Sequence, residues 1–154
     1  MGVQQLNNNS IRIRVSVLLK RDDGRICFVR HCKDGRRYWL LPGGGQDAGE
    51  SAKETAAREL AEELQIRAED FRLLFIRESI NKETGRHIQF MVFEGIRPDF
   101  STLATGIDPR VEGFDFFGPE DIEQVTIYPA MKTDLLDYAG GKTPELFRTL
   151  DWIS

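Results

Sequence analysis

Three glutamates on one predicted helix are the groups in this sequence best placed to do chemistry. Glu59, Glu62 and Glu63 are spaced i, i+3 and i+4, so a helix puts their carboxylates on one face. Carboxylates this close repel one another unless a positive charge lies between them. Oxygen ligands at this density suit Mg²⁺ or Mn²⁺. The residue types and their spacing therefore predict a divalent metal site.

A proline followed by three glycines, residues 42–45, precedes this helix. Glycine lets the backbone approach a ligand closely and adopt conformations closed to other residues. Ala56, Leu60 and Leu64 recur at i, i+4 and i+8 and predict a separate apolar face that packs on a core. Loop and helix together predict a site for a metal ion and a phosphate group.

Residues 44–66 follow a fixed spacing that extends this pattern. Gly44 is followed after five residues by Glu50, and after seven more by the run Arg58–Glu63, which leads to Ile66. The spacing resembles the Nudix box of the Nudix hydrolases. Gln65 departs from it, because the family has a glycine there that ends the catalytic helix in a left-handed conformation. A glutamine in that conformation costs on the order of 1 kcal/mol, and the change removes no carboxylate.

The resemblance implies the roles of several residues. Mg²⁺, or Mn²⁺ in its place, is expected to bind the Gly43 carbonyl and the three box carboxylates: Glu59, Glu62 and Glu63. The general base is either a box glutamate or a carboxylate outside the box. Glu112, at the start of a predicted strand after a long loop, is the candidate outside the box.

The resemblance also implies which residues support the site and what fold holds it. Glu50 and Arg58 are expected to tie the loop to the helix beside Gly44, without taking part in the reaction. The expected fold is α/β, a Nudix-type α/β/α sandwich with a mixed central sheet. Residues 1–10 are expected to form a flexible arm and residues 11–154 a single Nudix hydrolase domain.

Alternating apolar residues predict the strands of this fold. Residues 11–19 alternate, and residues 26–31 are expected to form a second strand after an Asp-Gly turn. Residues 38–41 lead into the glycine loop after a turn at 33–37. Three further strands and a second helix are predicted beyond the box, at 71–79, 87–96, 112–117 and about 130–138. A turn or one-turn helix is expected at 118–121, a loop at 97–110, and a short terminal segment that caps the fold.

Length and composition bound the function. The 154 residues suit one domain, and the net charge of −4 argues against a protein that coats nucleic acid. There is no apolar run of the length that a membrane span needs. Cys27 and Cys32 have an odd offset on one predicted strand, which makes them poor disulfide partners. We expect a soluble, reduced and cytoplasmic protein.

Other side chains are weaker candidates for binding a nucleotide. Five arginines could contact phosphates, although most are expected to be solvated: Arg12, Arg14, Arg30, Arg36 and Arg37. Trp39 and the phenylalanines of residues 114–117 could stack on a base, but aromatic residues of this kind more often pack in a core. His31 and the cysteines lack the spacing of a zinc site.

The first functional hypothesis is a Mg²⁺-dependent pyrophosphohydrolase. Its expected substrate is a nucleoside diphosphate linked to another group, such as a nucleoside triphosphate, a nucleotide sugar including ADP-ribose, or a dinucleoside polyphosphate. Nucleic acid is not an expected partner, except for the 5′ end of an RNA. The alternative is a nucleotide-sensing module that keeps the fold without turnover, although all box carboxylates are present. Many relatives are dimers, so a homodimer is one expected assembly.

Overall fold

The glycine loop is part of the larger of two β-sheets. The computed structural model describes residues 10–152. Five strands form a mixed sheet in the order β4-β1-β6-β5-β8. Their bounds are β1 Ile11–Leu18, β4 Gly43–Gly45, β5 Asp70–Ile80, β6 His87–Ile96 and β8 Phe147–Leu150. β1 pairs with β6 in parallel and with β4 antiparallel, so it joins the glycine loop directly to the sheet.

A second, smaller sheet is entirely antiparallel, with the order β3-β2-β7. Its strands are β2 Ile26–Lys33, β3 Arg36–Leu40 and β7 Val111–Phe117. β2 carries a register shift between Arg30 and His31 opposite β7. The shift changes the side-chain alternation at that point, next to the helix that carries the box.

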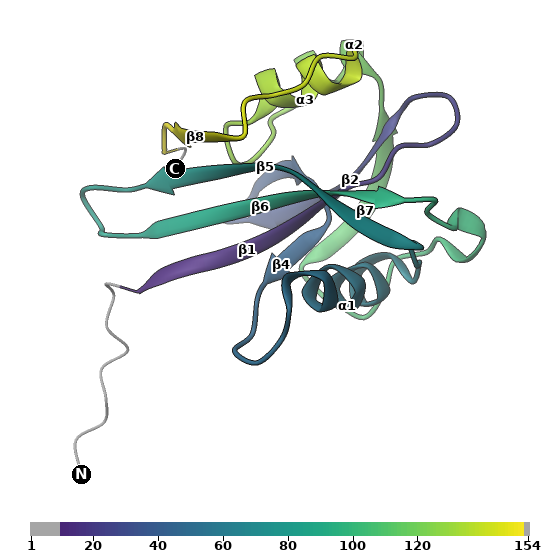
Figure 1. Cartoon of the computed structure of the whole chain (residues 1–154), viewed down its shortest axis with the longest axis horizontal. Coiled ribbons are helices and arrows are strands. Elements are labelled where there is room, and N and C mark those ends of the chain that lie inside the picture. Colours follow the sequence, from purple (N-terminus) through teal and green to yellow (C-terminus); the bar gives the residue numbers. More distant parts are fainter. Residues whose placement is uncertain (1–9, 153–154) are drawn as a thin grey trace.

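Helices lie on both sides of the five-stranded sheet (Figure 1). α1, Ala52–Leu64, lies on one side, and α2, Pro119–Gln124, and α3, Lys132–Ala139, lie on the other. A short 3₁₀ turn, Phe100–Thr102, interrupts the long loop before β7. The arrangement is the expected α/β/α sandwich, with the refinement that its strands divide into a mixed sheet and a separate antiparallel one.

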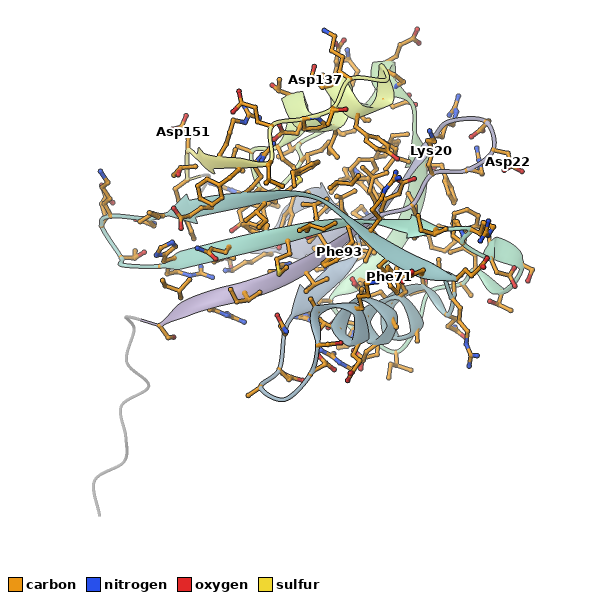
Figure 2. All side chains as sticks on the ribbon, viewed as in Figure 1. Lys20, Asp22, Phe71, Phe93, Asp137 and Asp151 are labelled. Atoms are coloured by element: carbon orange, nitrogen blue, oxygen red, sulfur yellow. The ribbon has the colours of Figure 1, made fainter. Side chains whose placement is uncertain are left out.

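Two hydrophobic clusters hold the layers together. One joins Leu60 and Leu64 of α1 to Phe71 and Phe93 of the sheet, and Figure 2 shows both phenylalanines between the sheet and the helix. The other, on the far side, contains Phe75 and Leu135 of α3. The predicted apolar face of the box helix therefore packs on the core. The box carboxylates lie on another face of the helix, next to the glycine loop.

The sequence located most of these elements, with four differences. The glycine loop, predicted without regular structure, contains the short strand β4. The predicted turn at 33–37 is shorter, because Lys33 ends β2 and Arg36 already begins β3. The turn or one-turn helix expected at 118–121 is a helix, α2, which continues to Gln124. The terminal segment, expected only as a cap, contains β8, which pairs in parallel with β5. β8 lacks the buried alternation that identifies a strand in a sequence, since Phe147 is exposed.

Three further expectations concern the ends, membranes and cysteines. The arm expected at residues 1–10 lies, apart from Ser10, outside the described residues. Within residues 10–152, no helix is long and apolar enough to cross a membrane. Cys27 is buried, Cys32 is exposed and both are free thiols, as their offset on β2 predicted.

Candidate active site

The glycine loop fits against the box helix more closely than any larger residue would allow. Gly43 donates its N–H to Glu63 Oε1 at 2.7 Å. A Cβ atom on Gly43 would lie 2.0 Å from the Val15 carbonyl oxygen, and one on Gly44 would lie 2.2 Å from Glu59 Oε1. The missing side chain of Gly44 thus lets the backbone pass beside the Glu59 carboxylate, and the missing side chain of Gly43 lets it pair closely with β1.

Both ends of the box helix are capped by the sequence. Ser51 accepts a hydrogen bond from Glu54 N at 3.1 Å, which satisfies one free N–H of the first turn. Gln65 ends the helix in the left-handed conformation, with φ 56° and ψ 33°. The left-handed helix end expected at this position is therefore present with glutamine in place of glycine. Gln65 also donates from its side chain to the Thr105 carbonyl at 2.9 Å.

Arg58 connects the loop to the helix. Its Nε and Nη2 contact the two oxygens of Glu50 at 2.8 and 2.9 Å, and Nη2 also contacts the Gly45 carbonyl at 3.2 Å. Arg58 holds the pKa of Glu50 down to about 2, with help from the Thr55 hydroxyl. This bidentate pair fixes the position of the loop relative to α1.

Glu59 and Glu63 are buried, and each is bound through only one oxygen. Glu59 Oε1 accepts from Arg58 at 2.9 Å and Glu63 Oε1 accepts from Gly43 N. The Oε2 atoms of both residues are buried without a hydrogen-bond partner. Burial, and then the charge of Glu63, raise the pKa of Glu59. Two carboxylates held this way create a local demand for a cation.

Glu62 faces outward from this pair. Its carboxylate is half exposed and accepts from Arg58 Nη1 at 3.3 Å. Within residues 10–152, no three His, Cys, Asp or Glu side chains converge as a complete ligand cluster. The box therefore presents two buried carboxylates, with the third held nearby by Arg58.

These residues nevertheless fit a divalent cation. The two unpartnered carboxylate oxygens are hard anionic donors, and the nearby Gly43 carbonyl is a neutral one. Buried carboxylates are costly unless a positive charge compensates them. The side chains that need compensation are Glu59 and Glu63, two of the ligands implied by the sequence resemblance.

Two basic side chains lie beside the carboxylate pair. Arg14 on β1 donates to the Gly43 carbonyl at 3.3 Å. Burial lowers the pKa of Arg14, against the opposing effect of the charges on Glu63 and Glu59. His31 Nε2 lies 3.8 Å from Glu63 Oε2, too far for a hydrogen bond, and is itself buried without a partner. Arg14 was a phosphate candidate from the sequence, whereas nothing in the spacing identified His31.

Glu112 is not brought together with the box carboxylates. Its carboxylate contacts Arg37 at 3.2 Å and Arg30 at 3.3 Å. Its neighbour Val111 packs in the same cluster as Leu60 of the box helix. The register shift between β2 and β7 lies at this position, so alternation along β7 does not place Glu112. Its partner Arg30 follows Val29, which packs with Leu60, and so lies on the opposite face of β2. Glu112 is therefore held on the side turned away from α1.

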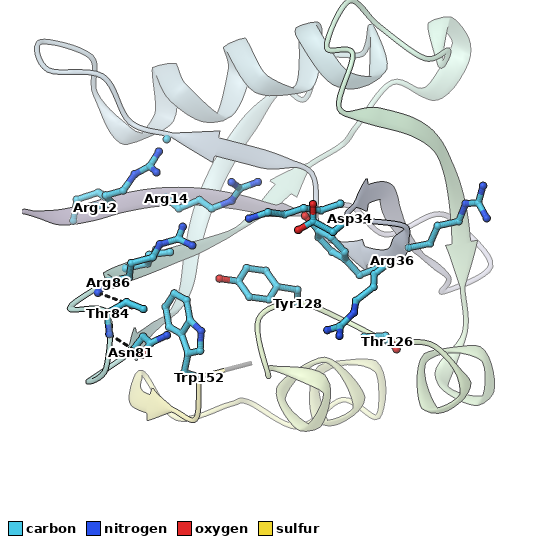
Figure 3. Close-up of a pocket in the computed structure, with 16 residues that line it drawn as sticks. Arg12, Arg14, Asp34, Arg36, Asn81, Thr84, Arg86, Thr126, Tyr128 and Trp152 are labelled. Atoms are coloured by element: carbon cyan, nitrogen blue, oxygen red, sulfur yellow. Dashed lines mark hydrogen bonds between the residues drawn. The ribbon is translucent and has the colours of Figure 1, made fainter. Parts of the chain in front are cut away.

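A pocket of about 1040 Å³ opens beside the glycine loop, with Arg14 and Gly45 in its wall. It is strongly cationic, since six basic side chains and one acidic side chain line it: Arg12, Arg14, Lys33, Arg36, Arg37 and Arg86, with Asp34. The basic side chains lie on β1, at the end of β2, at the start of β3 and just before β6, and Figure 3 shows Arg12, Arg14, Arg36 and Arg86 around the pocket. Four of the five arginines selected from the sequence line this pocket, and Arg30 is instead paired with Glu112.

The aromatic wall of the pocket differs from the one considered in the sequence. Trp39 packs against Phe117 in the core, with ring centroids 4.8 Å apart. Tyr38, Tyr128 and Trp152 line the pocket instead. Tyr128 and Trp152 lie in a loop and a terminal segment without a motif, so no local signal in the sequence could identify them.

Comparison with known protein families gives a match over most of the chain. The family model of the NUDIX domain matches residues 10–136. Among solved structures, a MutT NUDIX hydrolase from Burkholderia pseudomallei has a TM-score of 0.70 at 26% identity, over 83% of this chain and 97% of that one. A MutT protein from Bacillus halodurans has a TM-score of 0.74 at 17% identity, over 91% and 89% of the two chains.

Curated relatives match a shorter stretch. The RNA pyrophosphohydrolase of Shewanella denitrificans is 33% identical over 69 residues, which are 45% of this chain and 39% of that protein. The RNA pyrophosphohydrolase of Teredinibacter turnerae is 32% identical over 71 residues, or 46% and 41% of the two chains. The matched region thus spans about two fifths of the length of these relatives.

Proposed function

Because the chain belongs to the Nudix hydrolase family, we propose that it is a Mg²⁺-dependent pyrophosphohydrolase. The proposed reaction cleaves a phosphoanhydride bond of a nucleoside diphosphate linked to another group. A single observation carries this proposal: the pocket lined by six basic side chains adjoins the buried glutamate pair. Gly45 of the glycine loop lies in the pocket wall, together with Arg14, which donates to the Gly43 carbonyl, and Gly43 N–H donates to Glu63. An anion bound in the pocket would present its phosphates to the box.

The metal would be held by Glu59, Glu63 and the Gly43 carbonyl, with Glu62 joining on release from Arg58. Mn²⁺ is expected to substitute for it. A divalent cation there neutralises phosphate oxygens and makes a bound water more acidic. Arg58 and Glu50 keep loop and helix in place, and Arg14 neutralises a phosphate oxygen next to the Gly43 carbonyl.

A box glutamate is the proposed general base, in preference to Glu112. Glu112 is engaged by Arg30 and Arg37 on the side turned away from α1. Within the box, Glu62 is the most accessible of the three carboxylates, because Glu59 and Glu63 are buried. Under this proposal, Glu112→Gln keeps turnover within a few-fold of wild type. A hundredfold or larger loss of turnover in this variant would show that Glu112 is the general base.

The proposed substrate is a free nucleoside triphosphate or a nucleotide sugar, including ADP-ribose. A second candidate is the 5′ end of an RNA. Two observations favour this second candidate: the curated relatives are RNA pyrophosphohydrolases, and Lys33, Arg36 and Arg37 extend the cationic lining along the β2–β3 turn. Basic side chains in a row suit successive backbone phosphates.

The experiment is a substrate panel with Mg²⁺ and separation of the products. It contains nucleoside triphosphates, ADP-ribose and other nucleotide sugars, dinucleoside polyphosphates and a 5′-triphosphorylated oligoribonucleotide. Turnover of mononucleotides at least tenfold faster in kcat/KM supports the first candidate, and the reverse order supports RNA. Turnover of none of them, with a nucleotide still bound, would overturn the enzyme proposal and leave a nucleotide-sensing module.

A further inference from the structure

A buried ionic cluster fastens the C-terminal strand to the rest of the fold. Arg77 on β5 is fully buried and forms a bidentate pair with Asp134 on α3, at 2.8 and 2.9 Å. Arg148 on β8 contacts the same carboxylate. Arg77 also donates to the Glu145 carbonyl at 2.9 Å, just before β8 begins. The cluster fixes the path of β8 through three separate elements.

This path determines where Trp152 lies. Leu150, the last residue of β8, pairs with Ser79 of β5, and Trp152 follows two residues later. Both side chains pack against the cluster around Phe75 and Leu135. Trp152 is half-buried and lines the cationic pocket. A long-range ionic cluster therefore holds an aromatic ring at the wall of the proposed substrate pocket.

The surroundings of Trp152 are those of a stacking surface. The Arg86 guanidinium lies over its ring, 5.4 Å from the centroid. Figure 3 shows the indole below Arg86, with the hydroxyl of Tyr128 pointing toward the same side of the pocket. A planar ring beside a guanidinium and phosphate-binding arginines matches the parts of a nucleotide: a base with a π face, and an anionic chain.

We infer that Trp152 is the specificity-determining wall on which the base of the substrate stacks, with Arg86 fixing the ring and the arginines of β1 binding the phosphates. This inference rests on the proposed function, because it concerns the substrate of that same site. Stacking is tolerant of base identity, so Trp152 selects nucleotides over inorganic polyphosphates.

The presence of only two tryptophans makes the inference directly measurable. In Trp39→Phe the emission comes from Trp152 alone, and in Trp152→Phe from Trp39 alone, whose ring packs in the core. The probes are the α,β-methylene analogues of ADP, GDP, CDP and UDP, which cannot be cleaved at that bridge. Inorganic tripolyphosphate is the control without a base. Calorimetry reports binding independently of fluorescence.

At least one analogue should quench the emission of Trp39→Phe with the same Kd as in calorimetry, and leave Trp152→Phe unchanged. Tripolyphosphate should leave both unchanged. Trp152→Ala should weaken binding of that analogue about tenfold or more, and should raise KM far more than it lowers kcat. Trp152→Phe, which keeps an aromatic face, should recover most of the affinity.

Other outcomes overturn the inference in distinguishable ways. Analogues that bind by calorimetry without quenching Trp152, or equally well to Trp152→Ala, would exclude the stacking role and leave the proposed function intact. Equal quenching by tripolyphosphate would show that Trp152 responds to phosphate instead of a base. No binding of any analogue to the wild-type protein would overturn the inference, and the substrate panel would then decide the proposed function separately.

Discussion

Glu59 and Glu63 place two negative charges in a part of the protein from which water is excluded. Each has one oxygen in a hydrogen bond and one buried oxygen without a partner. In a folded protein such atoms are usually satisfied by an ion, a ligand or an ordered water. Under the proposed function, the arrangement would favour a bound cation at the expense of the metal-free fold.

Removing one of these charges should stabilise the metal-free protein. Glu59→Gln is expected to raise the free energy of unfolding in EDTA at pH 7 by on the order of 1 kcal/mol, while abolishing Mg²⁺-dependent turnover. Urea unfolding measures the first effect. Glu54→Gln, on an exposed position of the same helix, is the matched control. It should leave turnover unchanged and should not raise the free energy of unfolding, because a carboxylate in the first turn of a helix is favourable.

The pH dependence of this gain follows from the raised pKa of Glu59. Above the folded-state pKa the wild-type carboxylate is charged and the full penalty is present. As the pH falls through that pKa, the folded protein takes up a proton first and the penalty is relieved. The advantage of Glu59→Gln should therefore disappear below about pH 4, the ordinary range of a glutamate. An advantage that persists there would have another origin.

The sequence identified the site residues that belong to the box motif, and it did not identify the pocket residues that lie outside any motif. The spacing of the box identified the buried carboxylates and the Glu50–Arg58 pair, because a helix and its preceding loop are local structures. Tyr128 and Trp152 reach the pocket from a loop and from the end of β8. Their positions depend on packing between segments that are distant in the sequence, and the spacing of residues along the chain does not indicate such packing.

At the scale of elements, the loop before β7 completes the end of the box helix. Ala104, Gly106 and Ile107 donate their N–H groups to the carbonyls of residues 64, 63 and 62, at 3.1, 2.9 and 2.9 Å. The last carbonyls of a helix otherwise lack partners. Gln65 adds a side-chain hydrogen bond to the same loop. The loop thus fixes the end of the helix that carries Glu62 and Glu63.

Gln65→Gly is expected to change the free energy of unfolding by less than about 1 kcal/mol. Glycine relieves the left-handed strain of about 1 kcal/mol, but it loses the bond to Thr105, a loss of similar size. Gln65→Ala loses that bond and keeps the strain, so it should be the less stable of the two variants. Thermal or urea unfolding compares them, and an alanine variant as stable as the glycine one would contradict this account.

The cluster of Arg77, Asp134 and Arg148 should be a major source of stability for the C-terminal elements. Asp134→Asn leaves the fully buried Arg77 without its charged partner. We expect a loss of about 3–5 kcal/mol in the free energy of unfolding. Arg148 is partly exposed, so Arg148→Gln should cost clearly less. If urea unfolding gives similar losses for both variants, the Arg77–Asp134 pair is not the main stabilising contact of the cluster.

The elements with regular alternation were predictable, and β8 was not. β5 and β6 alternate between buried and less buried residues. β1 alternates in the sequence, but both of its faces are buried over residues 15–18. β8 is held by pairing with β5 and by the Arg77–Asp134 pair, whose members are 57 residues apart. Its structure is a consequence of tertiary contacts.

At the scale of the whole molecule, charge is segregated. The chain carries a net charge of −4, yet the pocket is lined by six basic side chains and one acidic one. The acidic excess therefore lies elsewhere on the protein. Such a concentration of one sign in a pocket attracts an oppositely charged ligand. The overall charge of the sequence gave no indication of this site.

Salt should therefore weaken substrate binding more than it slows turnover. Between about 50 and 200 mM KCl, the KM for a nucleotide substrate is expected to rise several-fold as the pocket charges are screened. Arg12→Gln should raise KM and flatten this dependence. Arg97→Gln is the control, because Arg97 pairs with Glu69 and does not line the pocket. Equal effects of the two variants would show that the pocket does not bind the substrate.

The turnover number of Glu63→Gln tests directly whether the buried glutamate pair binds the catalytic metal. It is measured on the best substrate of the panel with saturating Mg²⁺, beside that of Glu54→Gln. If Glu63 binds the catalytic metal, its kcat falls by about a thousandfold or more, equivalent to about 4 kcal/mol in the barrier, while circular dichroism stays that of the wild type. Glu54→Gln keeps full activity. A Glu63→Gln enzyme within about tenfold of wild type would contradict the assignment of the buried glutamate pair as the metal site.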